Sequence, residues 1–142
     1  MKIEFYLQQL KEHGLKITPK RKAAIELFLR KNSYLSPQKV LEKLGDNFPG
    51  ISSSTIYRIL EELKDIGILV KIEHEDRQLY YFLCRVPGKH HHHFICRKCK
   101  RVEEVNLCNF KEFERFISKN LNCKVENHSV QLEGLCSRCK RR

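Results

Sequence analysis

The stretch FPGISSSTIYRILEELKDIGIL, from Phe48 to Leu69, predicts a helix with two chemically different faces. A Phe-Pro-Gly turn precedes three serines, Ser52 to Ser54, and serine is a favoured helix N-cap. Gly67 is a typical residue just past a helix end. Apolar residues recur at helical spacing and predict the buried face: Ile56, Ile59, Leu60 and Leu63.

The segments around this helix predict a winged helix-turn-helix. Downstream, Ile68–Glu73 and Gln78–Leu83 read as two short strands joined by a polar turn, His74 to Arg77, in a hairpin. Upstream lie three shorter helices, and two of them open with Thr18-Pro19 and Ser36-Pro37, each an N-cap followed by proline at the first helical position. A small helical domain with an incidental hairpin is the alternative.

The charge of the chain favours a polyanionic partner. The formal net charge is +11, with 28 Lys and Arg against 17 Asp and Glu, as in proteins that bind nucleic acid. The polar face of the 48–69 helix carries Thr55, Tyr57 and Arg58 near its N-terminus, the end that meets bases and phosphates in such folds. A solvated basic surface is the alternative interpretation.

The remaining composition narrows the class of protein. No apolar run approaches 18 residues, so we expect no membrane span. The N-terminal MKIEFYLQQL is amphipathic and lacks the apolar stretch of a secretory signal, so we expect a cytoplasmic protein.

A second unit is predicted after a break at Val86–Lys89. Short strands at Phe94–Cys96 and Arg101–Val105, a helix capped by Asn109 and a strand at Lys124–Leu135 follow. About 50 residues are too few to fold comfortably alone, and a metal ion and a dimer partner are the usual remedies. The expected fold is α+β, a winged-helix domain over 1–84, a hinge over 85–89 and a small α/β dimerisation domain over 90–142.

Four of the seven cysteines form two Cys-x-x-Cys pairs, Cys96 with Cys99 and Cys136 with Cys139. An odd number of cysteines argues against a disulfide framework. Two such pairs complete the tetrahedral thiolate set of a structural zinc, which supplies roughly 10–16 kcal/mol of apparent folding free energy. A thioredoxin-like redox protein is the alternative of another class, although a redox pair needs no second pair.

Four consecutive histidines, His90 to His93, precede the first pair. The run is internal and apolar residues follow it, so it is not a purification tag. Alternate side chains of an extended segment face opposite sides, so His91 and His93 point one way and His90 and His92 the other. The run therefore predicts two metal sites with two ligands each, and a solvated polar loop is the alternative.

These motifs together resemble the ferric uptake regulator family of bacterial metal-dependent repressors, over essentially the whole chain. The resemblance implies a homodimer whose hinge metal closes two winged helices onto a palindromic double-stranded DNA operator. Family members respond to iron, zinc, manganese, nickel or peroxide. The matching stretches are Gly14–Arg21 (GLKITPKR), Phe48–Leu69, His90–Cys99 (HHHHFICRKC) and Asn127–Cys139 (NHSVQLEGLCSRC).

The resemblance also assigns residues. It gives the four paired cysteines to the structural zinc, His91 and His93 to the hinge sensor, and His90, His92 and His128 to a site inside the dimerisation domain. Lys16 corresponds to the basic residue that reaches the minor groove, and Tyr57 and Arg58 to the Tyr-Arg of the recognition helix. The candidate DNA contacts are Lys16, Arg21, Ser53, Thr55, Tyr57 and Arg58.

Two departures from the family concern the sensor. Iron- and peroxide-sensing members carry a His and an acidic ligand where this chain has Tyr34 and Tyr81, whereas zinc uptake regulators use a Cys after the second wing strand. Cys84 lies six residues before His90, and a soft thiolate favours zinc over iron. The expected sensor ligands are Cys84, His91 and His93, with a fourth from His74, Glu73 or Glu104; a small buried Cys84 without metal is the alternative.

A third departure concerns the inner site. Its usual glutamate corresponds to Lys111, and Glu112 lies a quarter turn away, so this site is expected to be weak or lost. Cys108 and Cys123 are interpreted as unpaired thiols. The sequence thus predicts a repressor rather than an enzyme, with a structural zinc and a regulatory zinc, iron or manganese ion. Zinc is the favoured signal, and an iron- or peroxide-responsive repressor is the alternative.

Overall fold

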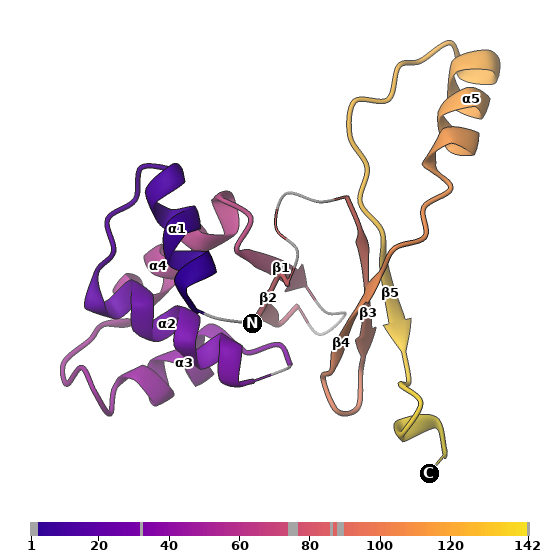
Figure 1. Ribbon diagram of the computed structural model, residues 1–142. Coiled ribbons are helices and arrows are strands. Elements are labelled where there is room, and N and C mark those ends of the chain that lie inside the picture. Colours follow the sequence, from indigo (N-terminus) through magenta and orange to yellow (C-terminus); the bar gives the residue numbers. More distant parts are fainter. Residues whose placement is uncertain (1–2, 32, 74–76, 86, 88–89, 142) are drawn as a thin grey trace. The chain divides into compact units, whose positions relative to one another are not determined.

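The computed structural model describes residues 3–31, 33–73, 77–85, 87 and 90–141. The chain divides into two compact units, residues 1–88 and residues 89–142. Among the described residues, the first unit holds four α-helices and a hairpin, and the second holds a three-stranded sheet, one α-helix and a short 3-10 helix (Figure 1). None of the helices in the described residues is long and apolar enough to cross a membrane. The predicted α+β class is confirmed.

The helices of the first unit begin where the sequence places their caps. Thr18 Oγ1, Ser36 Oγ and Ser52 Oγ each accept a hydrogen bond of 3.2 Å from the backbone N–H three residues later. Each bond satisfies one of the N–H groups that a helix start leaves without a partner. The helices are α1 (Ile3–Glu12), α2 (Pro19–Arg30), α3 (Pro37–Leu44) and α4 (Ser53–Asp65).

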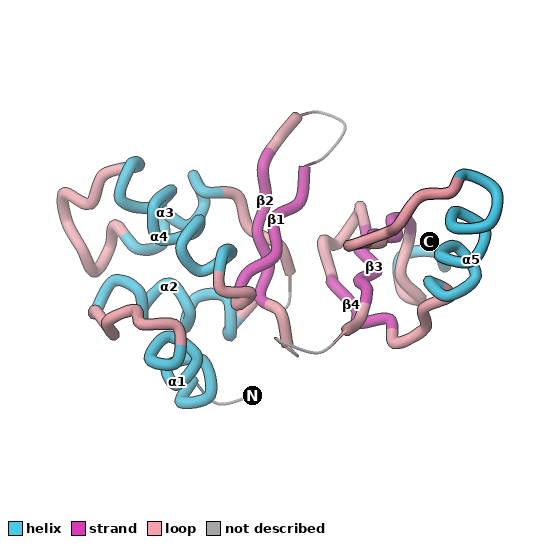
Figure 2. The backbone as a smooth tube through the Cα atoms, turned by 90° about the horizontal axis from the view of Figure 1, so that it is seen from above, coloured by secondary structure: helices cyan, strands magenta, loops and turns pink. Residues whose placement is uncertain are grey.

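The wing is an antiparallel hairpin of β1 (Leu69–Glu73) and β2 (Leu79–Leu83) (Figure 2). Leu69 pairs with Leu83 in its register. Both strands start one residue later than predicted. Gly67 precedes the hairpin with φ +85°, a backbone conformation that side chains disfavour. The core of this unit lies between the inward faces of the helices and the hairpin, and its largest fully buried side chains include Tyr6, Phe28, Leu60, Leu63 and Tyr81.

Tyr34 and Tyr81 belong to this core. Tyr34 packs edge-to-face on Tyr80 with ring centroids 4.8 Å apart, and the Tyr81 hydroxyl donates a 2.7 Å hydrogen bond to Glu61 Oε2. That bond lowers the pKa of the Glu61 carboxyl, while burial and the Glu61 contact raise the pKa of Tyr81. At these two positions the chain therefore uses tyrosine for packing and hydrogen bonding within the winged helix.

The second unit is a sheet of order β4-β3-β5, formed by β3 (His92–Cys96), β4 (Val102–Val105) and β5 (Gln131–Gly134). Strand β3 pairs antiparallel with β4 and parallel with β5. A parallel neighbour requires a crossover connection, and α5 (Phe110–Leu121) lies in it. The predicted strand Lys124–Leu135 is wrong in extent, because only residues 131–134 reach a partner strand.

Helix α5 stands apart from its own sheet, joined to it by two extended segments (Figure 1). It has no buried residue, and Phe113, Phe116 and Leu121 are 67%, 61% and 61% exposed. Asn109 occupies the N-cap position, but its side chain makes no capping hydrogen bond, contrary to expectation. An amphipathic helix with no fully buried residue in its own chain is consistent with the expected dimer, because its apolar face needs a surface to bury against.

Replacing Phe113 by Glu should convert the dimer to monomer at micromolar concentration, since a charge would enter a buried apolar contact. Sedimentation velocity measures this directly. Ser118→Glu, an exposed polar position on the same helix, is the matched control and should stay dimeric. A dimeric Phe113→Glu protein would show that α5 does not form the interface.

Candidate metal centres and DNA-binding surface

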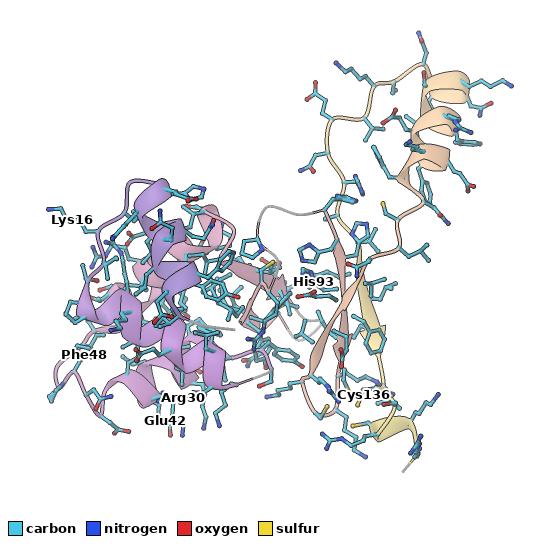
Figure 3. The ribbon with its side chains drawn as sticks, in the orientation of Figure 1. Lys16, Arg30, Glu42, Phe48, His93 and Cys136 are labelled. Carbon is cyan, nitrogen blue, oxygen red and sulfur yellow. The ribbon has the colours of Figure 1, made fainter. Side chains whose placement is uncertain are left out.

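The four paired cysteines meet at one end of the second unit. Cys96 ends β3, Cys99 lies in the turn toward β4, Cys136 follows β5, and Cys139 begins the short 3-10 helix η1 (Cys139–Arg141). Their four sulfurs all lie within 4.8 Å of one another, and those of Cys99 and Cys136 are 3.7 Å apart. Figure 3 shows Cys136 beside other sulfur atoms close to the C-terminal turn.

Backbone geometry favours the thiolate state at the first cysteine of each pair, Cys96 and Cys136. Each Cys-x-x-Cys turn closes on its first cysteine, with Lys100 N–H donating to Cys96 O and Lys140 N–H donating to Cys136 O. Backbone N–H donors, first among them that of Cys99, lower the pKa of Cys96, and that of Cys139 does the same for Cys136. Burial among the neighbouring thiols raises the pKa of Cys139.

This arrangement fits a tetrahedral zinc ion. Four sulfurs from two separated segments converge in a mostly buried cluster, and no cysteine of the described chain forms a disulfide. Backbone N–H groups that stabilise thiolates favour metal binding. A redox dithiol would require only one of the two pairs, so convergence of both favours the structural metal.

The histidines alternate as the sequence predicts. The Nε2 atoms of His91 and His93 are 2.9 Å apart, while His90 Nε2 lies 3.2 Å from His128 Nε2. His93 pairs in register with Glu104 on β4, and directly opposed residues of an antiparallel pair share a face. One Glu104 carboxylate oxygen is buried without a hydrogen-bond partner among the described residues.

The electrostatics of His93 suit a metal ligand. Burial, together with the nearby His91 and His92, lowers the pKa of His93 to about 4. The ring is therefore neutral near pH 7, and a neutral imidazole offers a lone pair to a metal. Of the other expected sensor ligands, Glu73 is the exposed last residue of β1, and His74 lies outside the described residues.

Cys84 directly follows β2 in the first unit, and both its backbone N–H and its backbone carbonyl form hydrogen bonds. Its N–H donates to Ile68 O at 2.9 Å, and its carbonyl accepts a buried 2.9 Å hydrogen bond from the Tyr6 hydroxyl. The position of the Cys84 backbone is thus set by the base of the wing and by α1.

The second face of the histidine run gathers His90, His92 and His128, as expected, but the fourth member is Cys108. Cys108 is a free, half-buried thiol, as expected, but its sulfur also lies 3.2 Å from His90 Nε2 and 3.3 Å from His128 Nε2, which the sequence did not predict. Glu112 is exposed in the first turn of α5 and is not among these ligand atoms. No spacing rule in the sequence links Cys108 to the histidines, so this contact depends on the fold.

The residues at the start of α4 that the sequence predicts to contact DNA are mostly exposed. Ser53, Tyr57 and Arg58 are exposed, and Thr55 Oγ1 lies 2.9 Å from the capping Ser52 Oγ. Lys16 projects outward from the loop between α1 and α2 (Figure 3).

Arg21 differs from the other predicted DNA contacts because its guanidinium already has protein partners. It donates a 2.8 Å hydrogen bond to Lys16 O and forms an ion pair with Glu62 of α4, and its side chain is only 14% exposed. Arg21 therefore ties the loop that carries Lys16 to the helix that carries Tyr57 and Arg58.

The sequence profile described as "Ferric uptake regulator family" matches residues 12–133. The chain belongs to the ferric uptake regulator family. The ferric uptake regulation protein of Staphylococcus epidermidis is 32% identical over 136 residues, which cover 96% of this chain and 94% of that protein. The family consists of metal-dependent, DNA-binding transcription regulators that act as dimers, and the chain is one of them.

Solved ferric uptake regulator family structures share the fold of this chain. A zinc uptake regulator complexed with zinc and DNA has a TM-score of 0.80 at 22% identity, covering 99% of this chain and 97% of that one. The Vibrio cholerae ferric uptake regulator has a TM-score of 0.62 at 29% identity, covering 92% and 99%. The relatives include ferric uptake regulators and a zinc uptake regulator. Similarity therefore does not decide which metal this chain senses, and the question turns on its own ligand residues.

Replacing Cys96 by Ser should unfold the second unit and dissociate the dimer, because a zinc site of this kind supplies much of the folding free energy of so small a unit. Zinc content, circular dichroism and sedimentation measure the effect. Cys123→Ser, at an exposed cysteine outside the cluster, should leave all three unchanged. A folded, dimeric and fully zinc-loaded Cys96→Ser protein contradicts the structural role.

Proposed function

We propose that this member of the ferric uptake regulator family is a zinc-responsive repressor of metal homeostasis genes. The observation that carries the proposal is the ligand chemistry near the hinge. At two positions where iron-sensing relatives carry metal ligands, this chain has Tyr34 and Tyr81, whose side chains are buried in the core of the first unit. A thiol, Cys84, directly follows the wing. A site of thiolate, imidazole and carboxylate suits zinc, whereas hard ions such as manganese prefer oxygen ligands.

The proposed sensor ligands are Cys84, His91 and His93, with Glu104 as the fourth. Support for Glu104 comes from its register opposite His93 and its buried oxygen without a partner among the described residues. A bound zinc ion would supply a positive charge that accepts the lone pairs of these four donors. The chain contributes rigid backbone at each end, through β3 and through the hydrogen bonds that hold Cys84.

A sensor of this composition would link metal binding to DNA binding. Cys84 belongs to the first unit and the histidines to the second, so an ion held by all of them favours one arrangement of the two. The ion shifts that equilibrium only by its differential affinity for the two arrangements. A hundredfold change in operator affinity requires about 2.8 kcal/mol of coupling, at about 1.4 kcal/mol for each factor of ten.

In the proposed DNA complex the N-terminal half of α4 enters the major groove and Lys16 contacts the flanking minor groove. Tyr57 and Arg58 would meet base edges, and the α4 N-terminus with Ser53 and Thr55 would meet phosphate. The Arg21–Glu62 ion pair would keep the Lys16 loop and α4 in register, which is a positioning role. Binding would weaken steeply with salt, since Lys and Arg release counterions from phosphate.

Arg58→Ala should weaken operator binding by about 1–3 kcal/mol, the usual cost of losing one base-reading side chain. Fluorescence anisotropy on a palindromic operator, with zinc present, measures this loss. The matched control for charge is Arg30→Ala, which removes an exposed arginine from the C-terminal end of α2 and leaves α4 unchanged. Equal losses in the two variants would contradict the assignment of α4 as the reading helix.

Zinc should restore operator binding at lower free concentration than iron(II) or manganese in protein stripped of sensor metal but retaining the four-cysteine zinc. Cys84→Ala should abolish this zinc dependence, because the only sulfur of the proposed sensor is lost, whereas Cys123→Ala should retain it. Zinc-dependent binding by Cys84→Ala overturns the ligand set. A preference for iron(II), or loss of binding through peroxide oxidation of His91, supports the iron- or peroxide-responsive alternative instead.

A further inference from the structure

We propose that Cys108 is the fourth ligand of a three-histidine, one-cysteine metal site inside the second unit, with His90, His92 and His128. Its thiolate would make the site selective for zinc and similar borderline cations over manganese and magnesium. This inference deepens the proposed function by adding a second zinc-class site. It does not require the hinge assignment, and it stands if the hinge responds to iron.

The four donor atoms already converge. Cys108 Sγ, His90 Nε2 and His128 Nε2 form a triangle with sides of 3.2, 3.3 and 3.2 Å. The His92 ring lies 5.0 Å from that of His90 and 5.4 Å from that of His128, centroid to centroid. All four ligand atoms lie within 4.8 Å of one another, a spacing that suits one ion with metal–nitrogen bonds of about 2.0 Å and a metal–sulfur bond of about 2.3 Å.

Hydrogen bonding alone does not satisfy this cluster. His92 is 5% exposed, and its Nε2 is buried with no hydrogen-bond partner among the described residues. A buried polar nitrogen without a partner is costly. One cation at the centre accepts lone pairs from His90, His92 and His128 and from the Cys108 thiolate, so it satisfies all four groups at once; the thiol proton is released to solvent.

The surroundings hold His128 in place for this role. Phe110 stacks on the His128 ring with centroids 3.9 Å apart and planes inclined by only 4°. The Asn127 side-chain oxygen accepts a 2.8 Å hydrogen bond from the His128 backbone N–H. Packing and hydrogen bonds that orient a ligand raise metal affinity, so the ring is positioned before an ion arrives.

The ligand at Cys108 determines which metal fits. Glu112 is not among the ligand atoms of the cluster, and Lys111 carries no acceptor for a cation. A carboxylate would suit manganese or magnesium, but a thiolate is a soft ligand that favours zinc. This chain therefore replaces an oxygen donor with sulfur at the inner site.

The location of the site gives it a structural consequence. Cys108 lies in the segment between β4 and α5, and His128 lies in the segment between α5 and β5. These are the two extended segments that connect α5 to the sheet (Figure 1), and His92 belongs to β3. An ion at this site would fasten both connections to the sheet and so restrict α5, which has no buried residue of its own.

Cobalt(II), added alone to Cys84→Ala protein that keeps its four-cysteine zinc, is the test. This background removes the thiol of the proposed hinge site, so Cys108 is the cysteine expected to bind a cobalt ion held by the histidines. We expect one sulfur-to-cobalt charge-transfer band, lost in Cys84→Ala/Cys108→Ala and retained in Cys84→Ala/Cys123→Ala. Zinc affinity measured by competition should fall by about tenfold or more in the Cys108 variant, since even indirect support of a ligand is worth about 10- to 100-fold.

Two outcomes overturn the proposal. One is a charge-transfer band that survives Cys108→Ala; the other is loss of cobalt binding on Glu112→Ala with none on Cys108→Ala. A folded Cys108→Ser protein, verified by circular dichroism, provides the same test with a side chain of similar size. Because every measurement is made without Cys84, failure here is distinguishable from failure of the hinge sensor, which the operator titration measures.

Discussion

The second unit depends on the convergence of four sulfurs from two ends of its sequence. Residues 96–99 end the first strand and open a hairpin, and residues 136–139 follow the last strand, so joining them closes the sheet around its central strand β3. The buried side chains among the described residues of this unit are few: Ile95, the two histidines His92 and His93, and three of the paired cysteines, Cys96, Cys136 and Cys139. Helix α5 adds apolar surface, but none of its residues is fully buried within its own chain. A metal ion at the four sulfurs and a second protomer would supply what this small unit lacks.

The first unit has a different source of stability, a core shared by four helices and the wing. Its polar contacts connect this core to function. Tyr6 holds the Cys84 carbonyl from α1, and Arg21 joins the Lys16 loop to Glu62 on α4. Each contact uses a buried or half-buried side chain to position a residue proposed to bind metal or DNA. The same packed helices therefore position both the surface proposed to contact DNA and Cys84 at the end of the wing.

The histidine run contributes to two candidate metal sites. Period-two alternation separates His91 and His93 from His90 and His92, and the two faces meet different partners: Glu104 across the strand pair on one side, Cys108 and His128 on the other. Buried polar atoms without partners in the described chain occur on both faces, at Glu104 and at His92. Such atoms are expected where donors are arranged for a cation rather than for one another.

Much of this protein is determined by local sequence signals. Thr18-Pro19, Ser36-Pro37 and Ser52 start their helices because a side-chain oxygen caps the first turn, and alternation sorts the histidines because a strand has period two. The tertiary structure decided the rest. Residues 124–130 do not extend β5, because a strand exists only where another strand pairs with it. Cys108 joins three histidines from distant segments because the connections of α5 return to the same end of the sheet, a proximity that no local spacing encodes.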